Sequence, residues 1–272
     1  MLEKSKVAFI GAGVMAEAII QGLLNRKVIA SGGITASDVR PERGKELMDR
    51  YAVSFTDDNR AAAEGADVVV LSVKPQTLPQ VMPALTGAVP ERALVLSIIA
   101  GAKIATITKG LAHPAVVRSM PNTPARIGRG MTVWTASSAV TELHRSQARE
   151  ILGALGMEVY VEEEPFLDAA TALSGSGPAY VFLFMEALVE AGIQLGFSPA
   201  VARQLVLQTM QGSVEYAGNS MLDLPQLRHQ VTSPGGTTAA AIQSFEAEGF
   251  REVVSRAVQA AHRRSIELGK GT

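Results

Sequence analysis

The fold is decided by ten residues near the start of the chain, Val7-Ala8-Phe9-Ile10-Gly11-Ala12-Gly13-Val14-Met15-Ala16. Four apolar residues end at a glycine, which is typical of a strand buried on both faces. The glycine fingerprint of dinucleotide-binding proteins follows, with Ala16 in the third glycine position. Gly11 permits a tight turn, and Gly13 lets the backbone approach a pyrophosphate at the positive end of a helix. A coincidental glycine turn is the alternative. The strand before it and the helix after it favour a cofactor site at Gly11, Gly13, Val14 and Met15.

Downstream of this turn, β-rich runs alternate with helical patterns through about the first 160 residues. Further strands are predicted over residues 34–37, 67–73, 94–98, 116–118 and 131–134. Buried strands that alternate with helices predict an α/β, Rossmann-like, doubly wound parallel sheet.

The pattern changes after Glu162-Glu163-Glu164-Pro165, beyond which no strand is expected. Helices are predicted over residues 178–196, 199–217 and 238–269, the last broken near Gly249. The first of these is apolar nearly all round, so it needs cover on every side, and a partner subunit is the obvious cover. We therefore expect a dinucleotide-binding domain over residues 1–163 and an all-α substrate-binding and dimerisation domain over residues 164–272.

The composition of the 272 residues narrows the function. A net charge of -1, with no basic block, provides no electrostatic footprint for nucleic acid. Cysteine is absent and the four histidines stand at least 31 residues apart, so no metal site is expected. The apolar runs at residues 93–102 and 180–188 are short or interrupted by Glu186, and no signal layout is seen. A cytoplasmic protein with no membrane span is expected.

The end of the second predicted strand bears on the choice of cofactor. Ser37, Arg40 and Arg43 suit a 2′-phosphate, because a hydroxyl and two guanidinium groups can donate to that dianion. Asp38 favours NAD instead, since an acidic residue here can accept from the ribose 2′-hydroxyl. Ordinary surface charges at a helix start are the remaining alternative. We expect NADPH (NADP+) to be preferred and NADH to be possible.

Three other segments are candidates for the cofactor site. Ser72-Val73-Lys74-Pro75 ends the strongest strand at its carboxyl end, where ligands bind in open parallel sheets. Asn59 either caps the helix that follows it or reaches the adenosine half of the cofactor. Asn122 lies in the rigid loop Met120-Pro121-Asn122-Thr123-Pro124, which either lines the site or is a structural turn.

A small polar ligand is predicted to bind at Val231-Thr232-Ser233-Pro234-Gly235-Gly236-Thr237-Thr238. Adjacent Gly235 and Gly236 let backbone N–H groups converge on an anion at a helix start, and the hydroxyls of Ser233, Thr237 and Thr238 can donate as well. A capping loop is the alternative. Ser174-Gly175-Ser176-Gly177-Pro178 is either a tight entry turn into the next helix or part of a site wall.

The scarcity of lysine narrows the class of reductase. From Pro165 onward the only lysine is Lys270. A 3-hydroxy-acid dehydrogenase of this layout would need a lysine there as general acid and base. A cyclic imine fits better, since a protonated imine accepts hydride without a strong enzymatic acid.

Taken together, these motifs resemble the pyrroline-5-carboxylate reductase family in order along essentially the whole chain. The most specific is the segment from Val231 to Thr238. The resemblance implies reduction of 1-pyrroline-5-carboxylate to L-proline with NADPH or NADH, the last step of proline synthesis. It also implies a helical domain that interlocks with a second subunit, in a homodimer or a higher ring such as a decamer.

The resemblance further implies site residues. The loop Ser233, Gly235, Gly236, Thr237 and Thr238 would bind the substrate, its amides meeting the carboxylate and Thr238 bonding the ring nitrogen as the catalytic residue. Asn59 and residues 72–75 would line the cofactor. One departure is Met221-Leu222-Asp223-Leu224-Pro225, where the family's acidic residue is shifted in spacing, so Asp223 either takes that role or the contact is missing. A reductase of a related cyclic imine, such as pyrroline-2-carboxylate, and a non-catalytic NADP-binding regulatory protein are the alternatives.

Overall fold

The computed structural model describes residues 2–270, which form two compact units. The first comprises the residues up to Ser176 together with those from Ala261 onward, and the second comprises Gly177–Ala260. The second unit is therefore an insertion in the sequence of the first.

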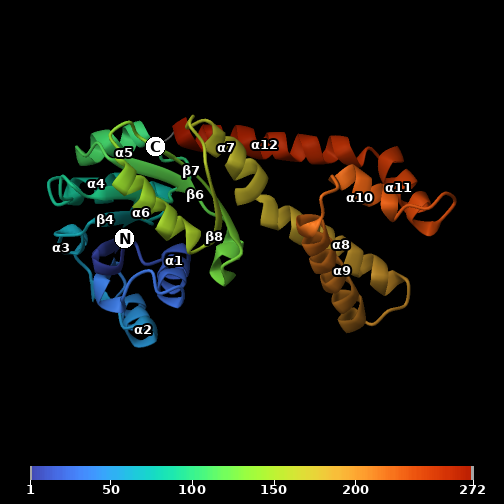
Figure 1. Cartoon of the computed structure of the whole chain (residues 1–272), viewed down its shortest axis with the longest axis horizontal. Coiled ribbons are helices and arrows are strands. Elements are labelled where there is room, and N and C mark those ends of the chain that lie inside the picture. Colours follow the sequence, from blue (N-terminus) through green and yellow to red (C-terminus); the bar gives the residue numbers. More distant parts are fainter. Residues whose placement is uncertain (1, 271–272) are drawn as a thin grey trace. The chain divides into compact units, whose positions relative to one another are not determined.

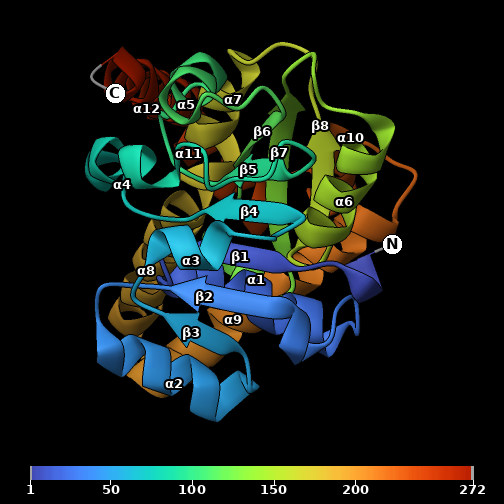
Figure 2. The same ribbon diagram turned by 90° about the vertical axis from the view of Figure 1, so that its left-hand side faces the viewer.

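An eight-stranded sheet forms the centre of the first unit (Figures 1 and 2), in the order β3-β2-β1-β4-β5-β6-β7-β8. Its strands are β1 Val7–Ile10, β2 Ile34–Ser37, β3 Ser54–Thr56, β4 Val68–Leu71, β5 Leu94–Ser97, β6 Val116–Met120, β7 Gly130–Ala136 and β8 Gly156–Tyr160. Neighbouring strands run parallel except β6 and β7. The chain winds outward from β1 in both directions, so the point where strand order reverses lies between β1 and β4. Ligands bind at such a point, beyond the carboxyl ends of the strands.

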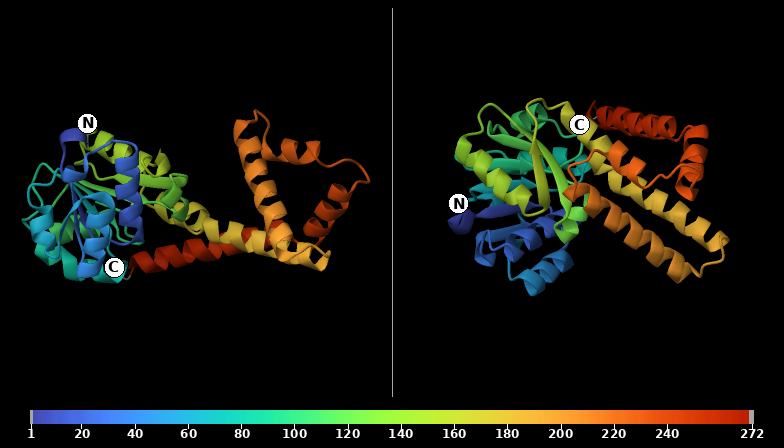
Figure 3. Two further views of the ribbon diagram at one scale, coloured as in Figure 1. Left: turned by 90° about the horizontal axis from the view of Figure 1, so that it is seen from below. Right: turned by 45° about the vertical axis from the view of Figure 1, so that its right-hand side comes forward.

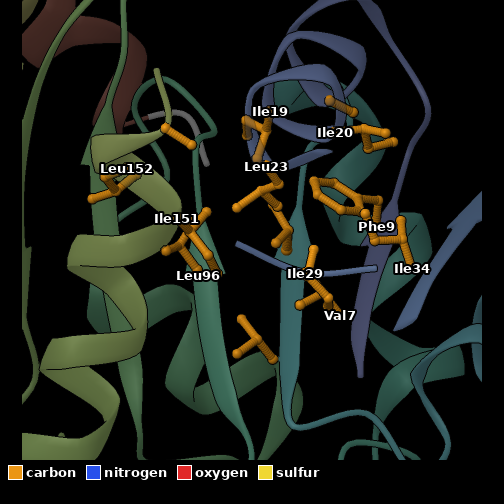
Figure 4. Packing of buried hydrophobic residues seen from close by; sticks show 14 of the residues in the cluster. Val7, Phe9, Ile19, Ile20, Leu23, Ile29, Ile34, Leu96, Ile151 and Leu152 are labelled. Carbon is orange, nitrogen blue, oxygen red and sulfur yellow. The ribbon is translucent and has the colours of Figure 1, made fainter. Parts of the chain in front are cut away.

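Helices cover both faces of this sheet because alternate strand residues point to opposite faces. Val7 and Phe9 of β1 pack in one buried cluster with α1, α2 and α6 (Figure 4), whereas Ala8 and Ile10 pack in another with α3, α4 and α5. The helices are α1 Val14–Asn25, α2 Pro41–Tyr51, α3 Asn59–Ala63, α4 Leu78–Leu85, α5 Ile104–Leu111, α6 Glu142–Gly153 and α7 Phe166–Ala170.

The second unit is helical (Figure 3) and contains α8 Gly177–Gln194, α9 Pro199–Asn219, α10 Leu224–Gln230, α11 Thr237–Ala247 and the first half of α12 Phe250–Lys270. Helices α8 and α9 approach closely, since a Cβ built on Gly192 would lie 3.1 Å from Ala202 Cβ. Phe184, Phe245 and Phe250 form a triangle of tilted rings 5.5 to 6.4 Å apart. No residue of α8 is buried within the single chain, and Leu183 is 67% exposed. The expectation that this apolar helix needs outside cover therefore agrees with its exposure.

The last residues of α12 belong to the first unit, where they meet a buried charged cluster. Ser265 Oγ donates to Asp168 Oδ1 at 2.8 Å. Arg118, whose side chain is 5% exposed, pairs with Glu164 at 2.9 Å and with Asp168 at 3.7 Å. The Ile104 N–H also donates to Glu164, at 2.8 Å. A buried charge is tolerated only when it is paired and hydrogen-bonded in this way.

The structure corrects several sequence predictions. The predicted α/β, Rossmann-like, doubly wound sheet is confirmed, but strands β3 and β8 were not expected, and β7 runs antiparallel to β6 within the otherwise parallel sheet. The segment from Ser174 to Pro178 is not an entry turn, because the chain is π-helical over Thr171–Gly175 and α-helical from Gly177.

The expectation that no segment could span a membrane is also wrong by the criteria of length and composition. Helical structure over Phe166–Gln194 gives one helix of 29 residues, and an 18-residue window of it has mean hydropathy 1.3. The sequence analysis treated residues 180–188 as interrupted by Glu186 and expected the helix to begin only at residue 178. Only 6% of the residues in that window are buried within the single chain.

Candidate functional site

The turn between β1 and α1 has the geometry of a phosphate-binding loop. Gly11 has a φ of +93°, and a Cβ there would lie 2.8 Å from Val73 Cγ1 and 2.9 Å from Val73 N. A side chain is excluded both by the backbone conformation and by the approach of the β4 end. Gly13 caps α1 without a side-chain hydrogen bond, and no heavy atom lies within 4 Å of where its Cβ would be. The space beside Gly13 is therefore open, and no side chain caps the first-turn amides of α1, which suits an anion.

Polar contacts hold this turn against the ends of two neighbouring strands. The Gly11 N–H donates to Ser37 O at 2.8 Å, and Ser72 Oγ donates to Gly11 O at 2.6 Å. Two of the predicted cofactor residues, Ser37 and Ser72, are thus brought to the glycine turn. Val14 is 59% exposed at the start of α1, and Met15 is half-buried against the core.

Ser37 and Asn59 come together at the ends of β2 and β3. Ser37 is fully buried, and its Oγ donates to Asn59 Oδ1 at 2.7 Å. Asn59 does not cap α3, because Asp58 does so by accepting from the N–H groups of Arg60 and Ala61. Of the two roles considered for Asn59, capping is therefore wrong. Within residues 2–270 its amide nitrogen donates no hydrogen bond, so it remains available to donate to a ligand.

Asp38 and Arg40 form a pair, although they favour opposite cofactors. Arg40 Nε and Nη2 donate to the two carboxylate oxygens of Asp38 at 2.9 and 3.1 Å. Burial raises the pKa of Asp38, but hydrogen bonds from the Arg40 side chain, from the Arg40 N–H and from the Ala12 N–H outweigh it, so the pKa lies below its ordinary value. The Arg40 side chain is 60% exposed. It can therefore face a 2′-phosphate while it neutralises Asp38.

Arg43 is engaged within the protein. Its Nε donates to Ala12 O at 2.7 Å, its Nη2 pairs with Glu17, and its Nη1 pairs with Glu46 at 2.7 Å. The Arg43 side chain is only 13% exposed. Burial raises the pKa of Glu17, but donors on Arg43, Tyr51 and Arg50 outweigh it and lower the pKa. The sequence suggested Arg43 as a phosphate ligand or an ordinary surface charge, and its contacts with Ala12 and Glu17 became apparent only in three dimensions.

The segment Ser72–Pro75 follows β4 directly. Lys74 is exposed, and Pro75 begins a short 3-10 turn, Pro75–Thr77. Val73 contributes its backbone and its Cγ1 to the wall against Gly11. Ser72 and Val73 thus both contact Gly11 of the glycine turn, and Lys74 and Pro75 follow them along the chain.

Asn122 is already used in the structure. Its Nδ2 donates to Ser174 O at 3.1 Å, and its Oδ1 accepts from the Met131 N–H at 2.9 Å. These bonds tie the loop after β6 to the π-helical turn and to the start of β7. The two bonds of Asn122 support the interpretation of this loop as a structural turn. A contact with the cofactor would have to form in addition to them.

The predicted substrate loop lies in the second unit, at the start of α11. The Gly236 N–H donates to Ser233 O at 3.1 Å across a turn in which Gly235 has a φ of +72°. Proline followed by glycine at the centre of the turn matches a type II turn. Gly236 caps α11 without a side-chain bond, so the first-turn amides, Thr237 and Thr238 are left at an open helix start. A Cβ on Gly236 would lie 2.9 Å from Ser233 Oγ, so a side chain there would displace the Ser233 hydroxyl.

Asp223 has a structural task near this loop in the sequence. Its carboxylate accepts from the Gln226 N–H at 2.8 Å, and the Gln226 side chain accepts from the Asp223 N–H at 3.0 Å. This reciprocal pair is a capping box at the start of α10. The shifted acidic residue is thus explained as a helix cap.

The sheet, its reversal point and the glycine turn define a dinucleotide-binding oxidoreductase fold. Residues 6–101 match a family described as NADP oxidoreductase, coenzyme F420-dependent, and residues 164–268 match the pyrroline-5-carboxylate reductase dimerisation family. The chain belongs to the pyrroline-5-carboxylate reductase family.

Full-length relatives establish that membership. The chain is 43% identical to the pyrroline-5-carboxylate reductase of Pseudomonas aeruginosa over 97% of each chain, and 42% identical to that of Synechocystis over 97% of this chain and 98% of the relative. The structure of the Coxiella burnetii pyrroline-5-carboxylate reductase superposes with a TM-score of 0.92 at 38% identity, covering 98% of this chain and 99% of that one. Pyrroline carboxylate reductase from Plasmodium falciparum, solved with NADP bound, gives a TM-score of 0.88 at 30% identity, covering 98% and 99%.

Proposed function

We propose that this protein reduces 1-pyrroline-5-carboxylate to L-proline with NADPH as the preferred reductant, the last step of proline biosynthesis. The single observation that carries the assignment is the full-length match to reductases of this name, with the glycine turn intact at the sheet's reversal point. NADH is a possible second reductant. When bound, the nicotinamide supplies a hydride to the imine carbon.

The chain's own residues bind and orient the reactants. The uncapped start of α1, with Gly11, Gly13, Val14 and Met15, receives the pyrophosphate. Arg40 and the amide of Asn59 take the 2′-phosphate, and Ser37 contributes to the cofactor site by holding Asn59 through its hydroxyl. Ser72, Val73, Lys74 and Pro75 line the nicotinamide half, with Asn122 at its edge. The open space beside Gly13 supports the first of these roles, and the free amide of Asn59 supports the second.

The loop before α11 binds the substrate. The Gly235 and Gly236 backbone and the hydroxyls of Ser233 and Thr237 meet the carboxylate, and Thr238 bonds the ring nitrogen as the catalytic residue. The uncapped helix start supports this assignment, because its amides attract an anion without any charged side chain. A ring nitrogen held at Thr238 presents the adjacent carbon for reduction with no lysine acid.

The assembly is proposed as a homodimer or a higher ring such as a decamer, in the cytoplasm. Residues 1–163 bind the dinucleotide, and residues 164–272 bind substrate and form the dimer. The exposed apolar residues of α8 support a second subunit as cover, since they lie in the segment that matches the dimerisation family. Neither a membrane nor a nucleic acid is a proposed partner. The net charge of -1 supports the exclusion of nucleic acid, because it provides no electrostatic attraction for phosphates.

The assay is nicotinamide oxidation by purified protein, run in parallel with NADPH and NADH. We expect saturable turnover of pyrroline-5-carboxylate, with L-proline as product and a lower KM for NADPH. Pyrroline-2-carboxylate and a six-membered homologue are the matched controls. Faster turnover of either control would reassign the substrate. Binding of NADPH without turnover of any imine would make the protein a regulatory NADP-binding protein.

A further inference from the structure

We propose that Arg43 is a positioning residue for the cofactor, which aims the Gly13 N–H at the pyrophosphate and so serves NADPH and NADH equally. This inference rests on the proposed function. It assigns different roles to Arg40 and Arg43, two arginines that follow β2 and that the sequence alone does not distinguish.

Two consecutive peptide groups form the glycine turn, and side chains hold both. The N–H of the Gly11–Ala12 peptide donates to Asp38 Oδ2 at 3.1 Å, and its carbonyl accepts from Ser72 Oγ at 2.6 Å. The carbonyl of the Ala12–Gly13 peptide accepts from Arg43 Nε at 2.7 Å. Within residues 2–270 the Gly13 N–H is the only group of these two peptides without a hydrogen-bond partner.

Peptide planarity determines where that remaining group points. The C=O and N–H of a trans peptide are coplanar and point in opposite directions. By holding Ala12 O, Arg43 therefore turns the Gly13 N–H away from itself, at the start of α1 where the helix amides are uncapped. A donor that is already fixed loses no conformational entropy when the ligand binds.

Arg43 is itself held rigidly, as a positioning residue must be. Glu17 on α1 and Glu46 on α2 both pair with its guanidinium, and its side chain is 13% exposed. Arg40, by contrast, is 60% exposed and carries only the Asp38 pair. Arg43 is thus bonded to the glycine turn, which binds the pyrophosphate that NADPH and NADH have in common. Arg40 instead faces the ribose 2′ position, where the two cofactors differ.

The experiment compares three arginine variants by calorimetric titration of NADPH and NADH, with no imine present. Arg43→Gln should raise both Kd values by the same factor, about tenfold, the size of one lost charge-assisted bond. Arg40→Gln should raise the Kd of NADPH alone. Arg50→Gln is the matched control, since Arg50 pairs with Glu17 but does not contact Ala12, and it should change neither Kd.

Other outcomes would overturn the proposal. A loss confined to NADPH in Arg43→Gln would mean that Arg43 binds the 2′-phosphate, and unchanged Kd values would mean that the turn holds its shape alone. Arg43→Lys keeps the charge beside Glu17 and Glu46, and therefore the fold, but removes the planar fork that reaches Ala12 and Glu17 together. It should also weaken both cofactors, whereas full affinity would show that charge alone suffices.

Kinetics provide an independent readout. With pyrroline-5-carboxylate, Arg43→Gln should raise the KM for both nicotinamides and leave kcat unchanged at cofactor saturation. A fall in kcat without a change in KM would contradict positioning. The titrations contain no imine, so they test the role of Arg43 in cofactor binding independently. Failure of the proposed reaction would therefore be distinguishable from failure of this inference.

Discussion

Ser265 donates a hydrogen bond to Asp168 at 2.8 Å, and both side chains are buried although 97 positions separate them in the sequence. The bond joins the end of α12 to a carboxylate that also pairs with Arg118. Ser265→Ala should lower the free energy of unfolding by about 1 to 3 kcal/mol, because Asp168 loses a buried donor. Urea unfolding provides the measurement. Ser255→Ala, at an exposed position of the same helix, should cost little, and equal losses in the two variants would refute a special role for the buried bond.

Asn59 should determine much of the preference for NADPH. Asn59→Ala removes the free amide donor and leaves Ser37 Oγ without its acceptor, so the Kd of NADPH should rise about tenfold and that of NADH much less. Asp58→Ala is the structural control, since it uncaps α3 without touching the amide. If Asp58→Ala changes the cofactor ratio equally, the effect belongs to α3 and not to Asn59.

Thr238 should affect turnover and not cofactor binding. Thr238→Ala is expected to lower kcat about 10²-fold, the size of the loss when a donor at a reacting centre is removed. The Kd of NADPH should be unchanged. Thr238→Ser keeps the hydroxyl and should restore most of the rate. Wild-type turnover in Thr238→Ala would remove Thr238 from the mechanism.

Asp223 should act through its cap and not through its charge. Asp223→Asn keeps an acceptor for the Gln226 N–H, so stability and kcat/KM should both stay near wild type. Asp223→Ala should cost about 1 kcal/mol of unfolding free energy, the usual loss of an N-cap. A large fall in kcat/KM for Asp223→Asn would show that the carboxylate has a role in the reaction after all.

His113 should make the protein less stable in mild acid. Burial lowers the pKa of His113, the hydrogen bond with Ala93 O opposes this, and neighbouring His144 adds to the lowering. The unfolded chain then binds a proton at higher pH than the folded one, so stability is full above the unfolded pKa of about 6.5 and falls as pH drops below it. His113→Gln should flatten this slope in urea unfolding at several pH values, and His229→Gln, at an exposed position, should not. An identical slope in wild type and His113→Gln would assign the effect to other groups.

The sequence predicted the central strands and the glycine turn well, because each carries a local signal. Val7–Ile10 is a continuous apolar run that ends at a glycine, and both faces of such a strand are covered. The edge strands lack that signal. Ser54–Thr56 has only three residues, and Gly156–Tyr160 has alternately exposed side chains, so neither carries a fully apolar run.

The reversal of β7 was predictable in principle. Only the residues from Pro121 to Arg129 separate β6 from β7. Parallel neighbours need a crossover of a dozen or more residues, so this connection favours an antiparallel pair. The contacts of Arg43 with Ala12 and Glu17, by contrast, depend on how α1 and α2 pack side by side, and no local pattern specifies them.

The division of the first unit into two sequence segments also has a consequence for how the protein is made. Asp168 and Arg118 are translated before the whole second unit, and Ser265 after it. At roughly 5 to 20 residues per second, Asp168 waits on the order of 5 to 20 s for its partner. The first unit thus reaches its final form only when translation is almost complete. A nascent chain stalled before Ser265 would carry all eight strands, but Asp168 would lack its hydrogen-bond donor.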